Sequence, residues 1–420
     1  MTIYTTFGFW PAVLSTLLVL YASVMPSPLS LLRRLLSRAE TTYHHSPNGT
    51  IKLRLKDQSE GTTRLVDFSK FVSNLLPSCN LNPILFNGHL QTIWTVAKPG
   101  DNVPIYYKRR IFDQEDQGYA GSFAVDFVVD PYDEAEARAK ATAETSSLAE
   151  DGGERDTGLP PRTTYLADAE WKVLDQGDSE SITPMLVVLH GLSGGSHEIY
   201  LRHVLYPLVY PSDSSPTRQK WEACVINSRG CAGSKITSNI LYNARATWDV
   251  RQVVRWLKER YPKRPLFGVG FSLGANILTN YLGEEGSQCP LQAALIISSP
   301  FNLEAASLSL QSTFVGLNIY SRAMGSNMKK LIDRHSREIT QNTKVDVEAV
   351  KKITYLHEFD REIQCPTWGY PTEGAYYRDA SSTDSLLAIR IPFLCISALD
   401  DPVNILLFLS SSIWCFGQAV

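Results

Sequence analysis

One short segment, GVGFSLG at residues 268–274, constrains the fold of this chain more than any other. It contains a G-x-S-x-G pattern centred on Ser272, and an apolar run at residues 266–269 leads into it. Residues 275–282 follow with no helix breaker and with apolar side chains at helical spacing. A strand, a sharp turn and a helix in this order predict a nucleophile elbow, in which the glycines let strand and helix approach closely. A plain glycine-rich turn is the alternative.

The rest of the chain supplies a sheet for this elbow. Continuous apolar runs, typical of parallel strands buried on both faces, lie at residues 185–189, 223–226, 266–269, 293–297 and 393–396. Helical spacing of apolar residues in 250–257 separates the second run from the third. Strands that alternate with helices predict an α/β protein with a doubly wound, mostly parallel sheet over residues 165–403.

Other segments depart from this rhythm. Residues 39–132 are expected to add strands at 51–55, 106–112 and 123–129 and a loop at 85–93. The next strand is expected at 171–174. Residues 133–164 are acidic and poor in large apolar side chains, so we predict a disordered insertion there. We expect residues 301–384, with a helical pattern over 310–332, to form a cap over the site.

A serine hydroxyl needs a base, an orienting acid and donors for the developing oxyanion. The segment HGLSGGS at residues 190–196 directly follows the first parallel strand. We expect the backbone N–H groups of Leu192 and Leu273 to form the oxyanion hole. A phosphate-binding turn is the alternative, although the segment lacks the Gly-Lys-Ser/Thr ending of such turns.

The acid is expected at the end of a later strand, where LDDPV occupies residues 399–403. We predict Asp401 as the acid of the triad, with Asp400 as the alternative. An ordinary surface turn without a catalytic role would also explain this pair of residues. The triad histidine normally follows the acid on such folds, and no histidine follows Asp401. His190 belongs to the oxyanion loop. The other histidines stand at 44, 45, 89, 197, 203, 335 and 357.

Taken together, these motifs resemble the membrane-anchored α/β-hydrolases that include fungal medium-chain fatty acid ethyl ester synthase/esterases and animal abhydrolase-domain lipases. The matching segments are FNGHLQT (86–92), HGLSGGS (190–196), NSRGCAGS (227–234), GFSLG (270–274), GYP (369–371), YYRDAS (376–381) and DDPV (400–403). The resemblance implies an α/β-hydrolase fold with Ser272 as the nucleophile and Asp401 or Asp400 as the acid. It also places Leu192 and Leu273 at the oxyanion positions.

The resemblance further implies the chemistry. We expect a serine esterase or acyltransferase that takes an acyl ester or acyl-CoA-type substrate, with water, ethanol or another alcohol as the acceptor. A non-catalytic, membrane-anchored protein of the same fold is one alternative, and a thioesterase or peptidase is another. The net charge of −3 gives no reason to expect nucleic acid as a partner. No cluster of metal-ligating residues is visible in the sequence, so no metal or cofactor is expected.

The first 38 residues predict attachment to a membrane. Residues 2–32 carry no charge and residues 7–25 are strongly apolar, which is about the ~20 residues that a spanning helix needs. Three arginines at residues 33–38 would hold the following chain in the cytosol. An interfacial anchor is the alternative. The pattern does not distinguish the endoplasmic reticulum, the lipid droplet and the mitochondrial outer membrane. Seven cysteines without C-x-x-C spacing agree with a reducing compartment.

The end of the chain departs from the family. Its members carry a Gly-His segment after the acid, with a closing strand and helix, whereas residues 404–420 are uncharged, mostly apolar and without histidine. We interpret this aberrant tail as the product of a truncated or misread gene model. A chain of this kind would expose a sheet edge and leave Ser272 without a base, so we expect poor expression and little activity.

Overall fold

The computed structural model describes residues 52–56, 63–67, 70–72, 82, 84, 85, 87–97, 103–134, 158–212, 219–341 and 344–403. The chain divides into two compact units, one of Met1–Thr42 with Asn74–Ala97 and one of Tyr43–Ser73 with Lys98–Val420. The predicted anchor at residues 1–38 and the tail at 404–420 lie outside the described residues. Within the described part of the chain, no helix has the length and apolar character needed to cross a membrane.

The smaller unit contributes one described helix, α4 (Gly88–Ala97). Our prediction of a loop over residues 85–93 was therefore wrong for its second half. The Asn87 side chain accepts a hydrogen bond from the Leu90 N–H at 2.9 Å, which caps the first turn. The Gln91 side chain donates back to the Leu85 carbonyl at 2.9 Å. These local polar contacts start a helix that apolar periodicity alone did not indicate.

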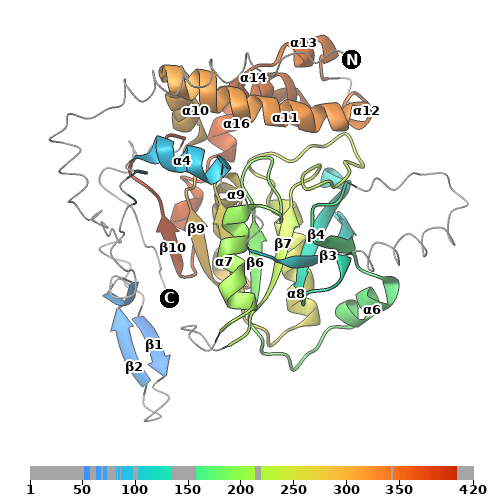
Figure 1. The fold of residues 1–420 in the computed structure, drawn as a ribbon, viewed down its shortest axis with the longest axis vertical. Helices are drawn as coiled ribbons and strands as arrows, with labels where there is room; N and C mark the ends of the chain where they lie inside the picture. The colour runs from blue at the N-terminus through green and yellow to red at the C-terminus, as the bar shows by residue number, and fades with distance from the viewer. Residues whose placement is uncertain are drawn as a thin grey trace, which may run out of the picture. The chain divides into compact units, whose positions relative to one another are not determined.

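A mixed sheet forms the centre of the larger unit, in the order β10-β9-β8-β6-β7-β4-β3-β5 (Figure 1). Its strands are β3 (Tyr106–Asp113), β4 (Ser122–Val129), β5 (Thr163–Tyr165), β6 (Met185–Leu189), β7 (Glu222–Asn227), β8 (Leu266–Phe271), β9 (Leu291–Ile297) and β10 (Phe393–Ile396). β4 is antiparallel to both of its neighbours, and the other described pairs of this sheet are parallel. The predicted α/β fold with a mostly parallel sheet is confirmed. A separate antiparallel pair joins β1 (Lys52–Lys56) to β2 (Thr63–Asp67).

Helices cover both faces of the sheet, which explains why β6 is apolar at every position. Val187 and Leu189 of β6 belong to the core on the side of α8 (Thr247–Arg260) and α9 (Leu273–Glu285). Leu186 and Val188 belong to the core on the side of α7 (Ile199–Val209). Figure 1 shows these helices on opposite faces. Each fully buried side chain of this size contributes about 2 kcal/mol to folding.

The segment at residues 171–174 is helical, which corrects our prediction of a strand. It lies in α6 (Asp168–Gln176), whose first turn is closed by a hydrogen bond from the Ala167 N–H to Glu170. Trp171 and Leu174 are three residues apart, so they face the same side of the helix and pack on the core. The missing edge strand is β5, which pairs with β3. β5 contains residues 163 and 164, so the predicted disordered insertion extends too far by at least these two residues.

Residues 301–384, here called the helical insertion, lie across one end of the sheet (Figure 1). The segment contains α10 (Leu303–Ser312), η3 (Gly316–Ser321), α11 (Arg322–Arg334), α12 (Ser336–Ile339), α13 (Val347–Lys352), α14 (Leu356–Phe359), η4 (Asp360–Gln364), α15 (Cys365–Trp368) and α16 (Glu373–Ala380). The helix predicted over 310–332 is interrupted, because Thr313 is extended and its hydroxyl accepts from the Gly316 N–H at 2.9 Å. The η3 segment that follows is π-helical.

An aromatic stack joins the helical insertion to the sheet layer. The rings of Tyr119 and Trp248 are nearly parallel, with centroids 4.1 Å apart, and Trp248 belongs to α8. Trp368, the last residue of α15, lies 5.1 Å from Trp248 between ring centroids. The stack therefore fixes α15 against a helix of the sheet layer.

Candidate active site

Ser272 occupies a strained turn between β8 and α9. Its backbone has φ 50° and ψ −117°, a region that residues with a side chain rarely adopt. Its N–H donates to the Ile297 carbonyl of β9 at 2.9 Å, and its carbonyl accepts from the Ala275 and Asn276 N–H groups at 3.0 and 3.1 Å. These hydrogen bonds compensate the strain and hold Ser272 at the carboxyl end of the strand. The geometry is that of a nucleophile elbow.

The glycines of the pattern stand where a side chain would collide with backbone. A Cβ at Gly270 would lie 2.6 Å from the Gly274 carbonyl oxygen. A Cβ at Gly274 would lie 2.4 Å from the His190 carbonyl oxygen. Strand, helix and the loop after β6 therefore meet at contact distances that only glycine allows.

The predicted oxyanion loop lies against the elbow. A Cβ built on Gly191 would be 3.4 Å from the Ser272 Cβ. On either side of Leu192 the path of the loop is fixed: the Gly191 N–H donates to Tyr200 Oη at 3.0 Å and the Ser193 N–H to a second tyrosine hydroxyl at 3.3 Å. Leu192 and Leu273 both line the pocket that contains Ser272. Their role as oxyanion donors stays a prediction.

His190 is buried beneath this loop and has its own partners. Its Nε2 accepts from the Ser228 N–H at 3.0 Å, and its Nδ1 donates to the Gly191 carbonyl at 2.7 Å. Burial lowers the pKa of His190 to about 4, against the opposing effect of the hydrogen bond to Gly191. The ring is therefore neutral and supports the loop, as expected for a residue that is not the base.

Asp401 lies in the turn after β10. Its Oδ1 accepts from the Val403 N–H at 2.9 Å, and Val403 lines the pocket. Burial, together with the negative charge of Asp401, raises the pKa of Tyr320 in η3 to about 12. Asp401 is half-buried, whereas Asp400 is exposed. These features favour Asp401 as the acid, although its catalytic role stays a prediction.

The described histidines of the larger unit have other surroundings than the pocket wall. None of the described residues on the pocket wall is a histidine. The His335 ring lies beside Gly230, since a Cβ built there would be 3.3 Å from its Cδ2. The His357 ring stacks on Tyr355 with centroids 5.8 Å apart. The described wall of the pocket therefore contains the serine of the elbow but no imidazole.

The pocket has a volume of about 100 Å³ and lies between the elbow and the helical insertion. Most of its wall is apolar, with Leu192, Leu273, Leu303, Leu310, Met324, Met328, Leu356 and Phe359. A smaller part is polar, with Asn243, Ser307, Asp360, Gln364, Tyr376 and Tyr377. A wall of this composition suits an acyl chain with a polar group at one end.

The motif YYRDAS at residues 376–381 stood out in the sequence without a role, and the structure shows that it anchors the insertion. Tyr376 Oη accepts from the Ala244 N–H at 3.0 Å. Tyr377 Oη donates to Asp360 Oδ2 at 2.8 Å, and Ser381 Oγ accepts from the Leu303 N–H at 2.9 Å. Three positions of one motif thus fix three separate segments around the pocket.

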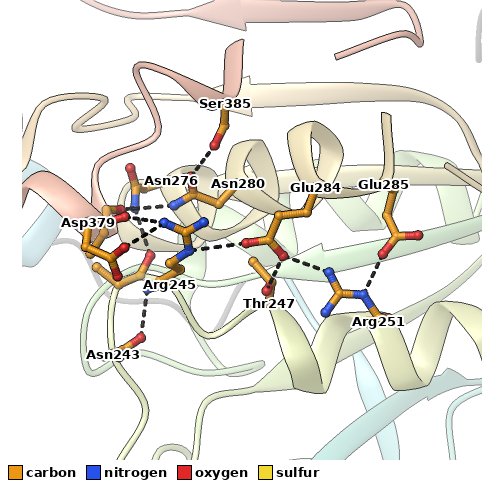
Figure 2. Close-up of polar contacts among 12 residues, drawn as sticks. Asn243, Arg245, Thr247, Arg251, Asn276, Asn280, Glu284, Glu285, Asp379 and Ser385 are labelled. Carbon is orange, nitrogen blue, oxygen red and sulfur yellow. Dashed lines mark hydrogen bonds and ion pairs between the residues drawn. The ribbon is translucent and has the colours of Figure 1, made fainter. Parts of the chain in front are cut away.

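The remaining part of this motif is tied to the helix that carries the elbow (Figure 2). Asn276 and Asn280 of α9 both donate to the Ala380 carbonyl, at 2.8 and 3.0 Å. Figure 2 shows Arg245 between Asp379 and Glu284, with ion-pair distances of 3.1 and 3.3 Å. The end of α16 and helix α9 are therefore held together by buried side-chain amides and by the more exposed ion pairs of Arg245.

Fold and site together define the class of this protein: an α/β protein with a serine at a nucleophile elbow, under a largely apolar pocket. The family model described as the alpha/beta hydrolase fold matches residues 184–406. The chain belongs to this family, as its motifs implied.

Relatives with known names extend the comparison. The chain is 32% identical over 383 residues to a monoacylglycerol lipase of Saccharomyces cerevisiae, with 89% of this chain and 81% of the relative covered. It is 31% identical over 388 residues to medium-chain fatty acid ethyl ester synthase/esterase 2 of the same yeast, covering 85% and 82%. It is 30% identical over 221 residues to human phospholipase ABHD3, covering 53% and 51%. Each of these names denotes a lipase or an esterase.

Proposed function

We propose that this carboxylic ester hydrolase acts on lipid-like esters, such as medium-chain acyl esters and acylglycerols, through an acyl-enzyme at Ser272. The observation that carries the proposal is the position of Ser272, held in a strained turn on the wall of a mainly apolar pocket. The yeast relatives, named as a monoacylglycerol lipase and an ethyl ester synthase/esterase, support the choice of substrate class.

The position of Ser272 on the pocket wall supports the following reaction. Ser272 Oγ attacks the ester carbonyl carbon and loses its proton to the histidine base that members of the family carry after the acid, and this base returns the proton to the leaving alcohol. The N–H groups of Leu192 and Leu273 stabilise the oxyanion, and one such donor is typically worth about 3 kcal/mol. Asp401 serves as the acid that orients the base. Water then attacks the acyl-enzyme and releases the carboxylic acid.

The acceptor decides between two products. Attack by water on the acyl-enzyme gives hydrolysis, whereas attack by ethanol or another alcohol gives a new ester. We propose that both acceptors compete for the same acyl-enzyme, and the double name of the second yeast relative supports this proposal.

We also propose that residues 1–38 attach the protein to a membrane with its catalytic unit in the cytosol. Their uncharged run and the arginines that follow support this placement.

Labelling with a fluorophosphonate probe tests the central claim. We expect an intact form of the protein, with a base for Ser272, to be labelled and its Ser272→Ala variant to lose at least 90% of the label, since the probe reacts with an activated serine. Ser287→Ala, an exposed serine in η2 (Gly286–Gln288), is the matched control and should be labelled like the parent chain. Undiminished labelling of a folded Ser272→Ala protein would contradict the assignment of the nucleophile.

A further inference from the structure

One π-helical turn places two buried polar side chains on the wall of the mainly apolar pocket. The turn is η4, and its first and last residues, Asp360 and Gln364, both line the pocket with Ser272. Asp360 is 9% exposed and Gln364 is 3% exposed. Burial of polar groups costs free energy unless they are hydrogen-bonded, and π-helical turns are frequent at functional sites.

Gln364 presents an acceptor that lacks a donor. Its Nε2 donates to the Tyr242 carbonyl at 3.0 Å. Because a carbonyl oxygen can only accept, the amide nitrogen must face Tyr242, and this fixes the direction of Oε1. Gln364 Oε1 is buried and has no hydrogen-bond partner among the described residues. An orphaned buried acceptor costs about 1–3 kcal/mol, a penalty that a ligand donor would remove.

Asp360 stands at the other end of the same turn. Its Oδ2 accepts from Tyr377 Oη at 2.8 Å, and Tyr377 Oη in turn accepts from Ser307 Oγ at 3.3 Å. Burial raises the pKa of Asp360 to about 7, opposed by the tyrosine hydrogen bond and assisted by the charge of Glu373. Near neutral pH the carboxyl is therefore present in both forms and can accept or donate a hydrogen bond. The other titratable groups around it are Tyr376 in α16 and Cys365 in α15.

We propose that Asp360 and Gln364 form a hydroxyl-binding subsite for the alcohol part of the ester, so that the enzyme prefers esters of polyols that keep a free hydroxyl group. A hydroxyl group of the substrate donates a hydrogen bond to Gln364 Oε1. With Asp360 it donates to the carboxylate or accepts from the protonated carboxyl group. The apolar wall of the same pocket would take the acyl chain. A site built to bond a hydroxyl discriminates strongly against an analogue that lacks it. The inference rests on the proposed function, since it assigns the two ends of that substrate.

Binding of two ether analogues, which cannot be hydrolysed, tests the subsite without relying on catalysis. The probes are 1-O-octylglycerol and octyl propyl ether, and the full chain is titrated with each while its tryptophan fluorescence is recorded. We expect the parent protein to bind the glycerol ether at least tenfold more tightly. Gln364→Leu should lose this preference by weakening the glycerol ether about tenfold and leaving the propyl ether unchanged. Gln288→Leu, at an exposed position in η2, should behave like the parent protein.

A second variant keeps the test decisive if Gln364→Leu does not fold. Asp360→Asn preserves the shape of the side chain, and we expect it to reduce the preference for the glycerol ether severalfold. We also expect the preference of the parent protein to change between pH 6 and 8, as Asp360 titrates, and that of the variant to stay constant. Equal binding of both ethers by the parent protein, or an unchanged preference in a folded variant, would overturn the subsite. Absence of labelling at Ser272 in an intact form of the protein, or its failure to hydrolyse both 1-octanoylglycerol and propyl octanoate, would instead overturn the proposed function.

Discussion

At the scale of single residues, the turn at Ser272 is held by hydrogen bonds of its own backbone. Ser272 adopts its rare conformation because β9 and the first turn of α9 bond its peptide groups on both sides. Gly270 and Gly274 contribute nothing except room for the backbone. The buried carboxyl of Asp360 is different, because its effect on stability depends on pH.

Asp360→Asn tests this dependence. The pKa of Asp360 is raised to about 7 in the folded protein from an ordinary value of 3.8. The folded state therefore binds more protons than the unfolded state, and the stability that this group contributes at low pH is lost as the pH rises through about 7. The loss is at most about 1.4 kcal/mol per pH unit, and asparagine does not incur it. We expect the free energy of unfolding of the variant, relative to the parent, to be higher at pH 8 than at pH 5 in urea titrations. Equal differences at both pH values would contradict the raised pKa.

At the scale of elements, helix α9 and the helical insertion are joined by two kinds of contact. The buried contact is Asn276 Nδ2, which donates to the Ala244 and Ala380 carbonyls at 2.8 Å each. The outer contact is Arg245, which forms ion pairs with Asp379 of α16 at 3.1 Å and with Glu284 of α9 at 3.3 Å; the side chains of Arg245 and Asp379 are 37% and 46% exposed. Solvent screens the outer pair but not the buried amide.

Two substitutions separate these contributions. We expect Asn276→Ala to lower the free energy of unfolding by about 2 kcal/mol, because it removes the Asn276 donor from the buried Ala244 carbonyl and one of the two amide donors of the Ala380 carbonyl. Arg245→Ala should lower it by less than about 1 kcal/mol, because its two ion pairs are partly exposed to solvent. Chemical denaturation of both variants gives the comparison. A larger loss of stability for Arg245→Ala than for Asn276→Ala would show that the ion pairs of Arg245, and not the side-chain amide of Asn276, hold α16 to α9.

The elements also show where sequence reasoning succeeds and where it stops. Strands such as β6 and β10 were predicted with the right bounds, because strands covered on both faces are apolar at nearly every position. Residues 171–174 of α6 were misassigned to a strand, since Trp171 and Leu174 give only one pair of core-facing side chains at helical spacing. The turn at Ser272 was predicted because an elbow of this kind requires glycines at fixed spacing, and the structure shows that turn. Asp360 and Gln364 were missed because only the folded chain brings a π-helical turn of the insertion beside the elbow.

At the scale of the whole molecule, attachment to a membrane would decide which substrates the pocket meets. Residues 1–38 carry the sequence signal, and they lie outside the described residues. We expect the full chain to stay in the pellet after carbonate extraction of cell membranes and its catalytic unit to be accessible to added protease. A chain without residues 1–38 is the control and should move to the supernatant. Recovery of the full chain in the supernatant, or protection of the catalytic unit, would contradict the proposal.

The aromatic stack of Tyr119, Trp248 and Trp368 gives the molecule an intrinsic optical reporter. Two indole rings, one on α15 of the helical insertion and one on α8 of the sheet layer, are 5.1 Å apart. At that separation their emission depends on each other, so a small shift of the insertion would change the spectrum. We expect the difference in fluorescence between the parent chain and Trp368→Phe to change when an ether ligand enters the pocket. A constant difference would mean that the insertion admits its ligand as a rigid roof.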